Sequence, residues 1–110
     1  MPSPLPPELL SRIAERFQGL SEPARLQLLS ALMDGEASVG ALAEATGLKQ
    51  ANVSRHLATL HRLKFVERRK QGLYTFYRIG DPGVFELCEL MCGRVQADMD
   101  RVRAVLESAS

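Results

Sequence analysis

The sequence lacks several features that would assign it to common functional classes. No run of apolar residues is long enough to cross a lipid bilayer, so we expect no contact with a membrane. The first seven residues hold four prolines but neither the basic nor the apolar region of a secretory signal, which predicts a cytoplasmic location. A glycine-rich phosphate loop and a hydrolytic set of side chains are also missing, so we expect no enzyme.

Cysteine and histidine, the usual ligands of transition metals, are scarce. The 110 residues contain two of each, Cys88 and Cys92, and His56 and His61. Because thiols stay reduced in the cytoplasm, we expect the two cysteines to be free rather than joined in a permanent disulfide.

Charge is present but unevenly distributed along the chain. Residues 49–78 carry eight lysines and arginines and one acid, a local net charge of +7. The other residues carry six bases and twelve acids, a net charge of −6, so the total is only +1. Clustered positive charge is typical of a nucleic-acid-binding face, because neutralised phosphates release condensed counterions. A solvated basic surface without a ligand is the alternative.

Both ends of the chain predict helices. Apolar residues at helical spacing indicate a helix over residues 7–19 and a second that begins with Ser21 as its N-cap. A long last helix over residues 84–106 places apolar side chains on one stripe: Val84, Cys88, Met91, Val95, Met99, Val102 and Leu106. A core this small cannot cover so long a stripe, which predicts association with a second copy of the chain.

The middle of the chain predicts a helix-turn-helix followed by a hairpin. Residues 38–64 contain two short helices, with Ser38 as a cap and Gly47 in the turn between them. Residues 65–79 are rich in aromatic and β-branched side chains around a glycine, the pattern of a β-hairpin with a basic tip. We therefore predict a single domain over residues 1–110, mainly α-helical with a two-stranded wing: a winged helix-turn-helix.

In this fold the second helix of the motif enters the major groove of DNA, and the wing lies along the phosphates or the minor groove. Gln50 and Asn52 carry amides that can pair with adenine, and Arg55 can pair with guanine or a phosphate. Taken singly, such side chains are often only the solvated face of a helix. The predicted DNA-binding residues are Lys49, Gln50, Asn52, Ser54, Arg55, His56, Arg62, Arg68, Arg69 and Lys70.

Most of the chain resembles the ArsR/SmtB-type repressors. The resemblance rests on Ser21–Leu26, Ser38-Val39 with Leu42-Ala43, Val53–Leu60, Phe65-Val66, and Gly72 with Phe76–Ile79. It implies a small dimeric winged-helix protein that leaves its operator when an inducer binds. It further implies that helices 7–19 and 84–106 form the dimer interface. Lys49 departs from the pattern, because relatives often place a capping serine there, and we expect it to contact a phosphate.

The resemblance also implies two common metal sites, and this sequence has neither. A thiolate pair in the third helix would fall on Ser38 and Gly40, which cannot bind a soft metal. The second site uses aspartate and histidine pairs on the last helix, but no histidine follows Arg62.

Cys88 and Cys92 remain as candidate sensor residues, one helical turn apart. A disulfide between them would require distortion of the helix, which would make it a usable redox switch. Alternatively, two such pairs across a dimer could bind a thiophilic ion such as Cd(II), Hg(II) or As(III). The third possibility is that the cysteines only pack in the core.

The sequence thus predicts a dimeric, sequence-specific transcriptional regulator, a repressor that an inducer releases from a palindromic DNA site. The alternative is a constitutive or differently induced regulator with no metal or redox site. A winged-helix module for RNA or protein contact is disfavoured by the basic hairpin and the base-reading residue types. A thiol oxidoreductase is disfavoured too, because such enzymes place C-x-x-C at a helix N-terminus.

Overall fold

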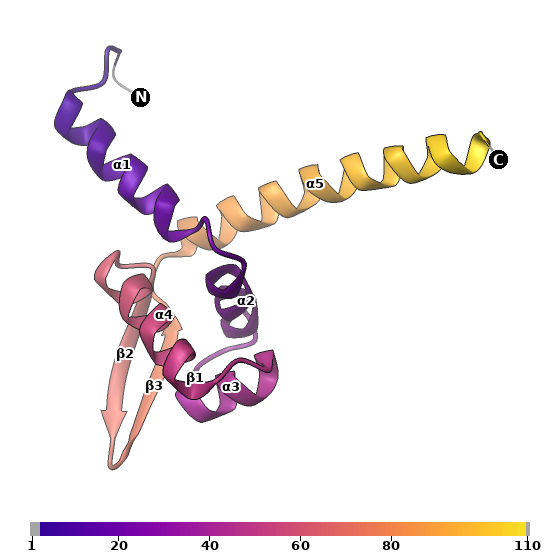
Figure 1. Ribbon diagram of the computed structural model, residues 1–110. Helices are drawn as coiled ribbons and strands as arrows, with labels where there is room; N and C mark the ends of the chain where they lie inside the picture. Colours follow the sequence, from indigo (N-terminus) through magenta and orange to yellow (C-terminus); the bar gives the residue numbers. More distant parts are fainter. Residues whose placement is uncertain (1–2, 110) are drawn as a thin grey trace.

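The computed structural model describes residues 3–109; Met1, Pro2 and Ser110, at the ends of the predicted domain, lie outside the described residues. Helices and strands follow the order α1, α2, β1, α3, α4, β2, β3 and α5 (Figure 1). Their bounds are α1 Pro7–Gly19, α2 Pro23–Leu32, β1 Ala37–Ser38, α3 Val39–Thr46, α4 Gln50–Arg62, β2 Val66–Gln71, β3 Tyr74–Ile79 and α5 Pro82–Ser108.

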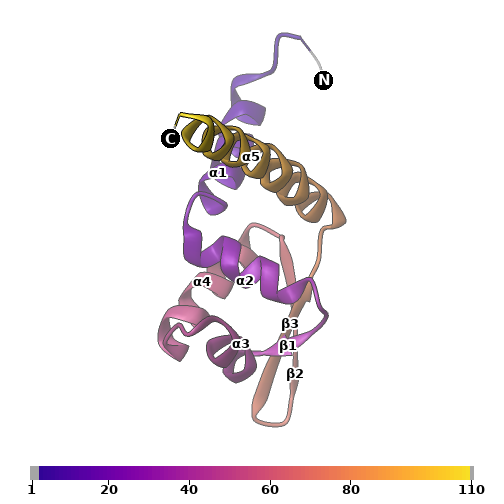
Figure 2. The same ribbon diagram turned by 90° about the vertical axis from the view of Figure 1, so that its right-hand side faces the viewer.

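The core forms where α2, α3 and α4 pack against the sheet, and α2 lies between α5 and α3 (Figure 2). Leu28 of α2 and Leu57 and Leu60 of α4 have no exposed surface. Burying one such leucine contributes about 1.5–3 kcal/mol relative to leaving it in water. The buried apolar residues are Leu28, Leu29, Leu32, Leu42, Val53, Leu57, Leu60, Leu63, Phe65, Val66, Tyr77 and Val84.

The turn between α3 and α4 is made by residues suited to helix ends. The Oγ atom of Ser38 accepts a hydrogen bond from the backbone N–H of Ala41 at 3.1 Å, which confirms the predicted N-cap of α3. Gly47 ends the helix with φ +75°, and its N–H donates to the carbonyl of Ala43 at 2.9 Å. These contacts set the direction in which α4 leaves the turn.

The wing is an antiparallel hairpin of β2 and β3, joined by Gly72 and Leu73. Gly72 has φ +61°, a left-handed conformation that other residues adopt only at a cost. A third strand, β1, pairs with β3 and gives the strand order β1-β3-β2. The expected two-stranded wing is confirmed, and β1 extends it to a three-stranded sheet.

Two predicted helix starts differ from the structure. Ser21 does not cap α2; its hydroxyl donates to the carbonyl of Gln18 at 2.7 Å, and Glu22 takes the N-cap position. The last helix begins at Pro82 rather than at residue 84, because Asp81 caps it by accepting from the N–H of Gly83 at 2.9 Å. Proline is well tolerated in a first helical turn, where no backbone donor is lost.

The two outer helices leave the compact part of the molecule at the end opposite the wing tip and diverge from each other (Figure 1). Most of α5 extends beyond the core, and its apolar stripe from Met91 to Leu106 is exposed. Leu10 and Phe17 of α1 are exposed as well. The monomer thus leaves much apolar surface of α1 and α5 uncovered.

Candidate DNA-binding surface

Helix α4 has an apolar inner face and a polar outer face. Val53, Leu57 and Leu60 are buried in the core and fix the rotation of the helix about its axis. The exposed predicted residues on and before this helix are Lys49, Gln50, Asn52, Ser54, Arg55 and Arg62. The structure places their side chains in solvent, where a DNA groove could reach them.

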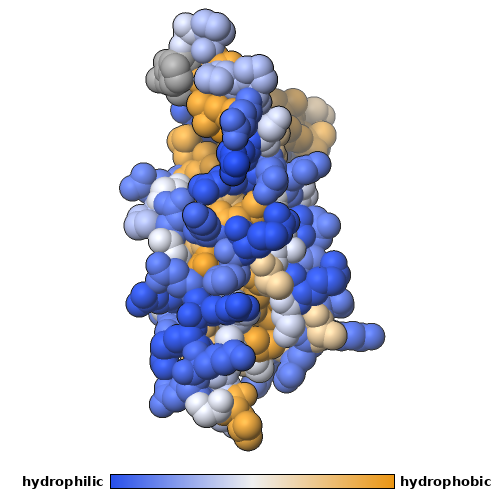
Figure 3. All heavy atoms as spheres, turned by 90° about the vertical axis from the view of Figure 1, so that its left-hand side faces the viewer, coloured by the Kyte–Doolittle hydropathy of each residue, from blue (hydrophilic) through white to orange (hydrophobic). Residues whose placement is uncertain are grey.

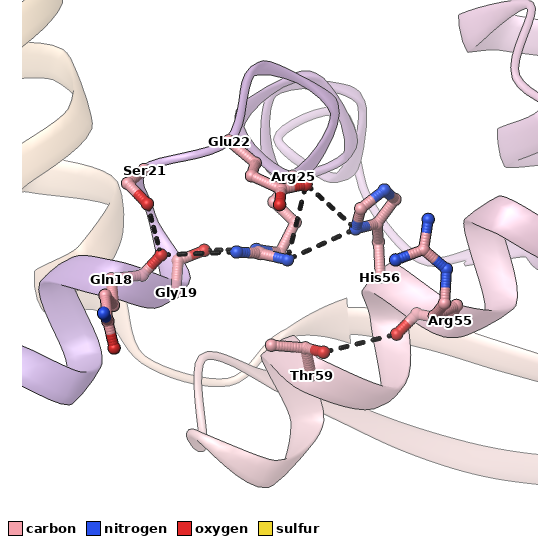
Figure 4. A network of polar contacts seen from close by, with 8 residues as sticks. All are labelled: Gln18, Gly19, Ser21, Glu22, Arg25, Arg55, His56 and Thr59. Carbon is pink, nitrogen blue, oxygen red and sulfur yellow. Dashed lines mark hydrogen bonds and ion pairs between the residues drawn. The ribbon is translucent and has the colours of Figure 1, made fainter.

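The structure corrects the expected position of His56. Only 4% of this residue is exposed, so it lies on the inner side of α4 rather than on the outward arc. A guanidinium nitrogen of Arg25 lies 3.4 Å from its Nδ1 atom (Figure 4). The pKa of His56 is lowered, first by burial and then by the charge of Arg55, although the carboxylate of Glu22 acts in the opposite direction. His56 in this position is closed to DNA.

The basic side chains of β2 project from both faces of the sheet, because side chains alternate along a strand. Arg68 and Lys70 share a face with the buried Val66, so they project on the side where α4 packs. Figure 3 shows hydrophilic residues over much of the lower part of one side of the molecule, above an apolar tip at the level of the β2–β3 turn. Leu73, in that turn, is fully exposed.

Arg69 projects from the opposite face and is already bound by an acid. Its guanidinium donates to both carboxylate oxygens of Glu36, with distances of 2.6–3.0 Å, and lies 4.6 Å from the ring centre of Phe76. The hydrogen bond from Arg69 lowers the pKa of Glu36. Arg69 is therefore a wing-anchoring residue in this structure, and a phosphate would have to compete with Glu36 for it.

Arg62 is also paired, with Glu15 of α1 at 3.3 Å. More than half of each side chain is exposed, and exposed pairs of this kind contribute little to stability. Arg62 can therefore exchange Glu15 for a phosphate more readily than Arg69 can exchange Glu36.

The two cysteines lie apart from this surface, on the first half of α5. Cys88 is half-buried against the core, and burial raises the pKa of its thiol, whereas Cys92 is exposed. Both line an apolar cavity of about 990 Å³ between α1, α2 and α5, together with Phe17, Leu26 and Met91. Within residues 3–109, no three His, Cys, Asp or Glu side chains are placed to bind a metal together.

The fold and the exposed helix define a winged helix-turn-helix protein, and comparisons with known proteins identify its family. Residues 22–68 match the model of the bacterial regulatory proteins of the arsR family. The chain is 38% identical over 86 residues to the regulator KmtR of Mycobacterium tuberculosis, covering 78% of this chain and 66% of KmtR. It thus spans slightly less than two thirds of the length of that relative.

Two solved structures confirm the fold. The homodimeric winged helix-turn-helix DNA-binding domain of Mb0332 from Mycobacterium bovis has 35% identity and a TM-score of 0.74, covering 89% of each chain. The antimony-specific transcriptional repressor AntR has 30% identity and a TM-score of 0.77, covering 89% of this chain and 90% of AntR. The chain belongs to the ArsR family. In the described part of the chain, no helix has the length and apolarity needed to span a membrane.

Proposed function

We propose that this protein is a cytoplasmic, dimeric transcriptional regulator that represses by binding a palindromic DNA site. The observation that carries the proposal is the outer face of α4, where Gln50, Asn52 and Arg55 are exposed on a helix whose other face is locked into the core. Amide and guanidinium groups are the side chains best suited to base edges in the major groove. The names of Mb0332 and AntR, a DNA-binding domain and a repressor, support this function.

A homodimer accounts for the uncovered apolar surface of α1 and α5. At 1.5 Å per residue the 27 residues of α5 extend about 40 Å, well beyond the core of one chain. A second copy related by a two-fold axis would bury the stripe and place two recognition helices about 34–36 Å apart, one turn of DNA. Mb0332, named as a homodimer, has the same fold.

For the inducer, we propose thiol chemistry at Cys88 and Cys92. They are the two thiols of the chain, and they lie on the helix that would set the spacing of the two DNA-binding units. One chain supplies two thiols and no nearby third ligand among the described residues, so a complete soft site would need the second chain as well. A thiophilic ion would stabilise the thiolate that burial disfavours at Cys88. AntR, named for antimony, is consistent with this class of ion.

The packing of Cys88 favours the alternative, a constitutive or differently induced regulator. Cys88 contacts the core cluster, and a buried cysteine behaves as a small apolar residue. The two proposals are distinguished by adding a thiophilic ion. Thiol induction predicts that the parent loses DNA binding and that a cysteine-free variant does not.

The central experiment is selection of DNA by the protein from a random duplex library. We expect enrichment of an inverted repeat with half-sites about one helical turn apart. Binding of the enriched duplex should exceed binding of a scrambled duplex at the same salt concentration. If no sequence is enriched, the protein does not bind DNA in the way proposed.

A further inference from the structure

A polar cluster joins three helices at the point where α1 ends, α2 begins and α4 passes beneath them (Figure 4). The side chain of Arg25, on α2, is 12% exposed. Its Nε atom donates to the carbonyl of Gly19 at 2.6 Å, and a terminal nitrogen donates to the carbonyl of Gln18 at 3.3 Å. The last carbonyls of a helix have no partner within it. Arg25 therefore provides hydrogen-bond donors for these carbonyls and holds the end of α1 against α2.

The same guanidinium reaches the recognition helix through His56. One terminal nitrogen lies 3.4 Å from the Nδ1 atom of His56 and 3.6 Å from a carboxylate oxygen of Glu22. A guanidinium can only donate, so Nδ1 must accept, and the neutral ring carries its proton on Nε2. Apart from Tyr77, His56 is the one buried residue with a polar side chain in the described part of the chain. Placing a polar group there has a desolvation cost that this contact offsets.

We propose that Arg25 and His56 are positioning residues for DNA recognition, which set the orientation of α4 against the end of α1 without touching DNA. The proposal rests on the proposed DNA-binding function. His56 directly follows Arg55 in the chain and lies one helical turn after Asn52 on α4, so any movement of its backbone moves both of these exposed side chains. Hydrogen bonds to base edges tolerate only a few tenths of an ångström, so a small rotation of α4 would lower specific affinity. Because α1 belongs to the proposed dimer surface, the same contact links each recognition helix to the dimer.

The charges around His56 give the proposal a pH dependence. The groups that face the ring are Glu22, which is the N-cap of α2, Arg25 of α2 and Arg55 of α4, while α1 contributes only backbone carbonyls. Burial and the two arginines lower the pKa of His56 below its ordinary value of 6.5, so the ring is neutral at pH 7. As the pH falls below 6.5 toward the lowered pKa, a growing fraction of rings binds a proton. The protonated ring cannot accept from Arg25 and repels it, so specific DNA binding should weaken on acidification.

Three variants separate positioning from mere stability. His56→Leu removes the acceptor, His56→Asn retains an acceptor oxygen near the Nδ1 position but cannot titrate, and Arg25→Lys retains the charge but not the forked donor. The probe is the duplex that the parent protein enriches from a random library, with a scrambled duplex for non-specific binding. His61→Asn, which replaces the other histidine of α4, is the matched control.

We expect His56→Leu and Arg25→Lys to lose about tenfold in affinity for the enriched duplex. Non-specific affinity and its salt dependence should be unchanged, because no phosphate contact is removed. His56→Asn should bind well at pH 7.5 and lose the weakening that the parent shows on acidification below pH 6.5, which His61→Asn should retain. The proposal is overturned if folded His56→Leu binds as the parent does, or if His56→Asn follows the pH profile of the parent.

A measurement without DNA keeps this proposal separate from the proposed function. Residual dipolar couplings report the angle between α1 and α4 in the parent and in Arg25→Lys. If the parent enriches no duplex, the DNA-binding function fails, and the angle alone decides whether Arg25 orients α4. A changed angle supports the orienting role, and an unchanged angle overturns it.

Discussion

Asn52 is the residue whose role can be tested most directly, because its amide is exposed on the outer face of α4 and supports no contact in the core. We predict that Asn52→Ala costs about 1–3 kcal/mol of binding free energy to the enriched duplex and relaxes preference at one base pair per half-site. Binding should be measured against duplexes with single base-pair changes. Arg68→Ala is the contrasting variant, expected to weaken all sequences alike and to reduce the salt dependence. Unchanged sequence preference in Asn52→Ala would contradict the assignment.

Residue positions on α4 could be predicted from the sequence, with one instructive exception. Val53, Leu57 and Leu60 follow helical spacing, and the structure buries all three. His56, at i+3 from Val53, lies on the same side of the helix, but its polar type suggested exposure. The spacing contained the signal for its burial. The missing information was its partner, since Arg25 is 31 residues away in the chain.

At the scale of helices and strands, the sequence predicted the features that depend on contacts between neighbouring residues. Ser38 and Gly47 were identifiable from the sequence because a cap and a left-handed turn depend on neighbouring residues. Strand β1 was missed because its two residues are too short for a periodic pattern and exist only through pairing with β3. The pairing of Arg69 with Glu36 was missed for the same reason, since it forms only when the wing meets the segment before β1.

The pairing of Glu36 with Arg69 leads to a prediction for the wing. Glu36→Gln should release the guanidinium of Arg69, so that it can bind a phosphate. We expect higher affinity for all DNA sequences and a steeper salt dependence, by about one phosphate contact per subunit. Titration of enriched and scrambled duplexes over a range of salt concentrations measures both.

The carboxylate of Glu67, on β2, offers the control for this experiment. Glu67→Gln releases Arg78, whose nitrogen lies 2.6 Å from the carboxylate of Glu67. Arg69→Ala in the Glu36→Gln background should remove the gain. If the gain persists without Arg69, it comes only from the loss of a negative charge near DNA.

For the whole molecule, the exposed stripe of α5 predicts dependence on the dimer. Met99, which is 53% exposed in the single chain, lies in the middle of the stripe. Met99→Glu would place a charge in the proposed interface, where burial of an unpaired carboxylate costs several kcal/mol. We expect a monomer in sedimentation at micromolar concentration, with loss of specific DNA binding. Ala104→Glu adds the same charge on the opposite side of the helix and should remain a dimer.

The last prediction concerns how an inducer would act on the dimer as a whole. Cys88 and Cys92 lie where α5 leaves the core, so a ligand bound to them would alter the angle at which two chains meet. To shift DNA occupancy from 99:1 to 1:99, an inducer must favour the DNA-free arrangement by about 5.5 kcal/mol. Several sulfur–metal bonds across the dimer, or one strained disulfide, are strong enough to supply this difference. Weak packing changes around two thiols are not strong enough to supply a difference of this size.

We therefore predict that Cd(II), Hg(II), As(III), Sb(III) or an oxidant releases the parent protein from its enriched duplex, and that the Cys88→Ser/Cys92→Ser double variant stays bound. Each single variant assigns the contribution of one sulfur. Cys92 is exposed and should react first, whereas burial raises the pKa of the Cys88 thiol and should slow its reaction. Release of parent and double variant at equal concentrations would show that the agent acts elsewhere. If the parent ignores every agent, the cysteines serve only to pack α5 against the core.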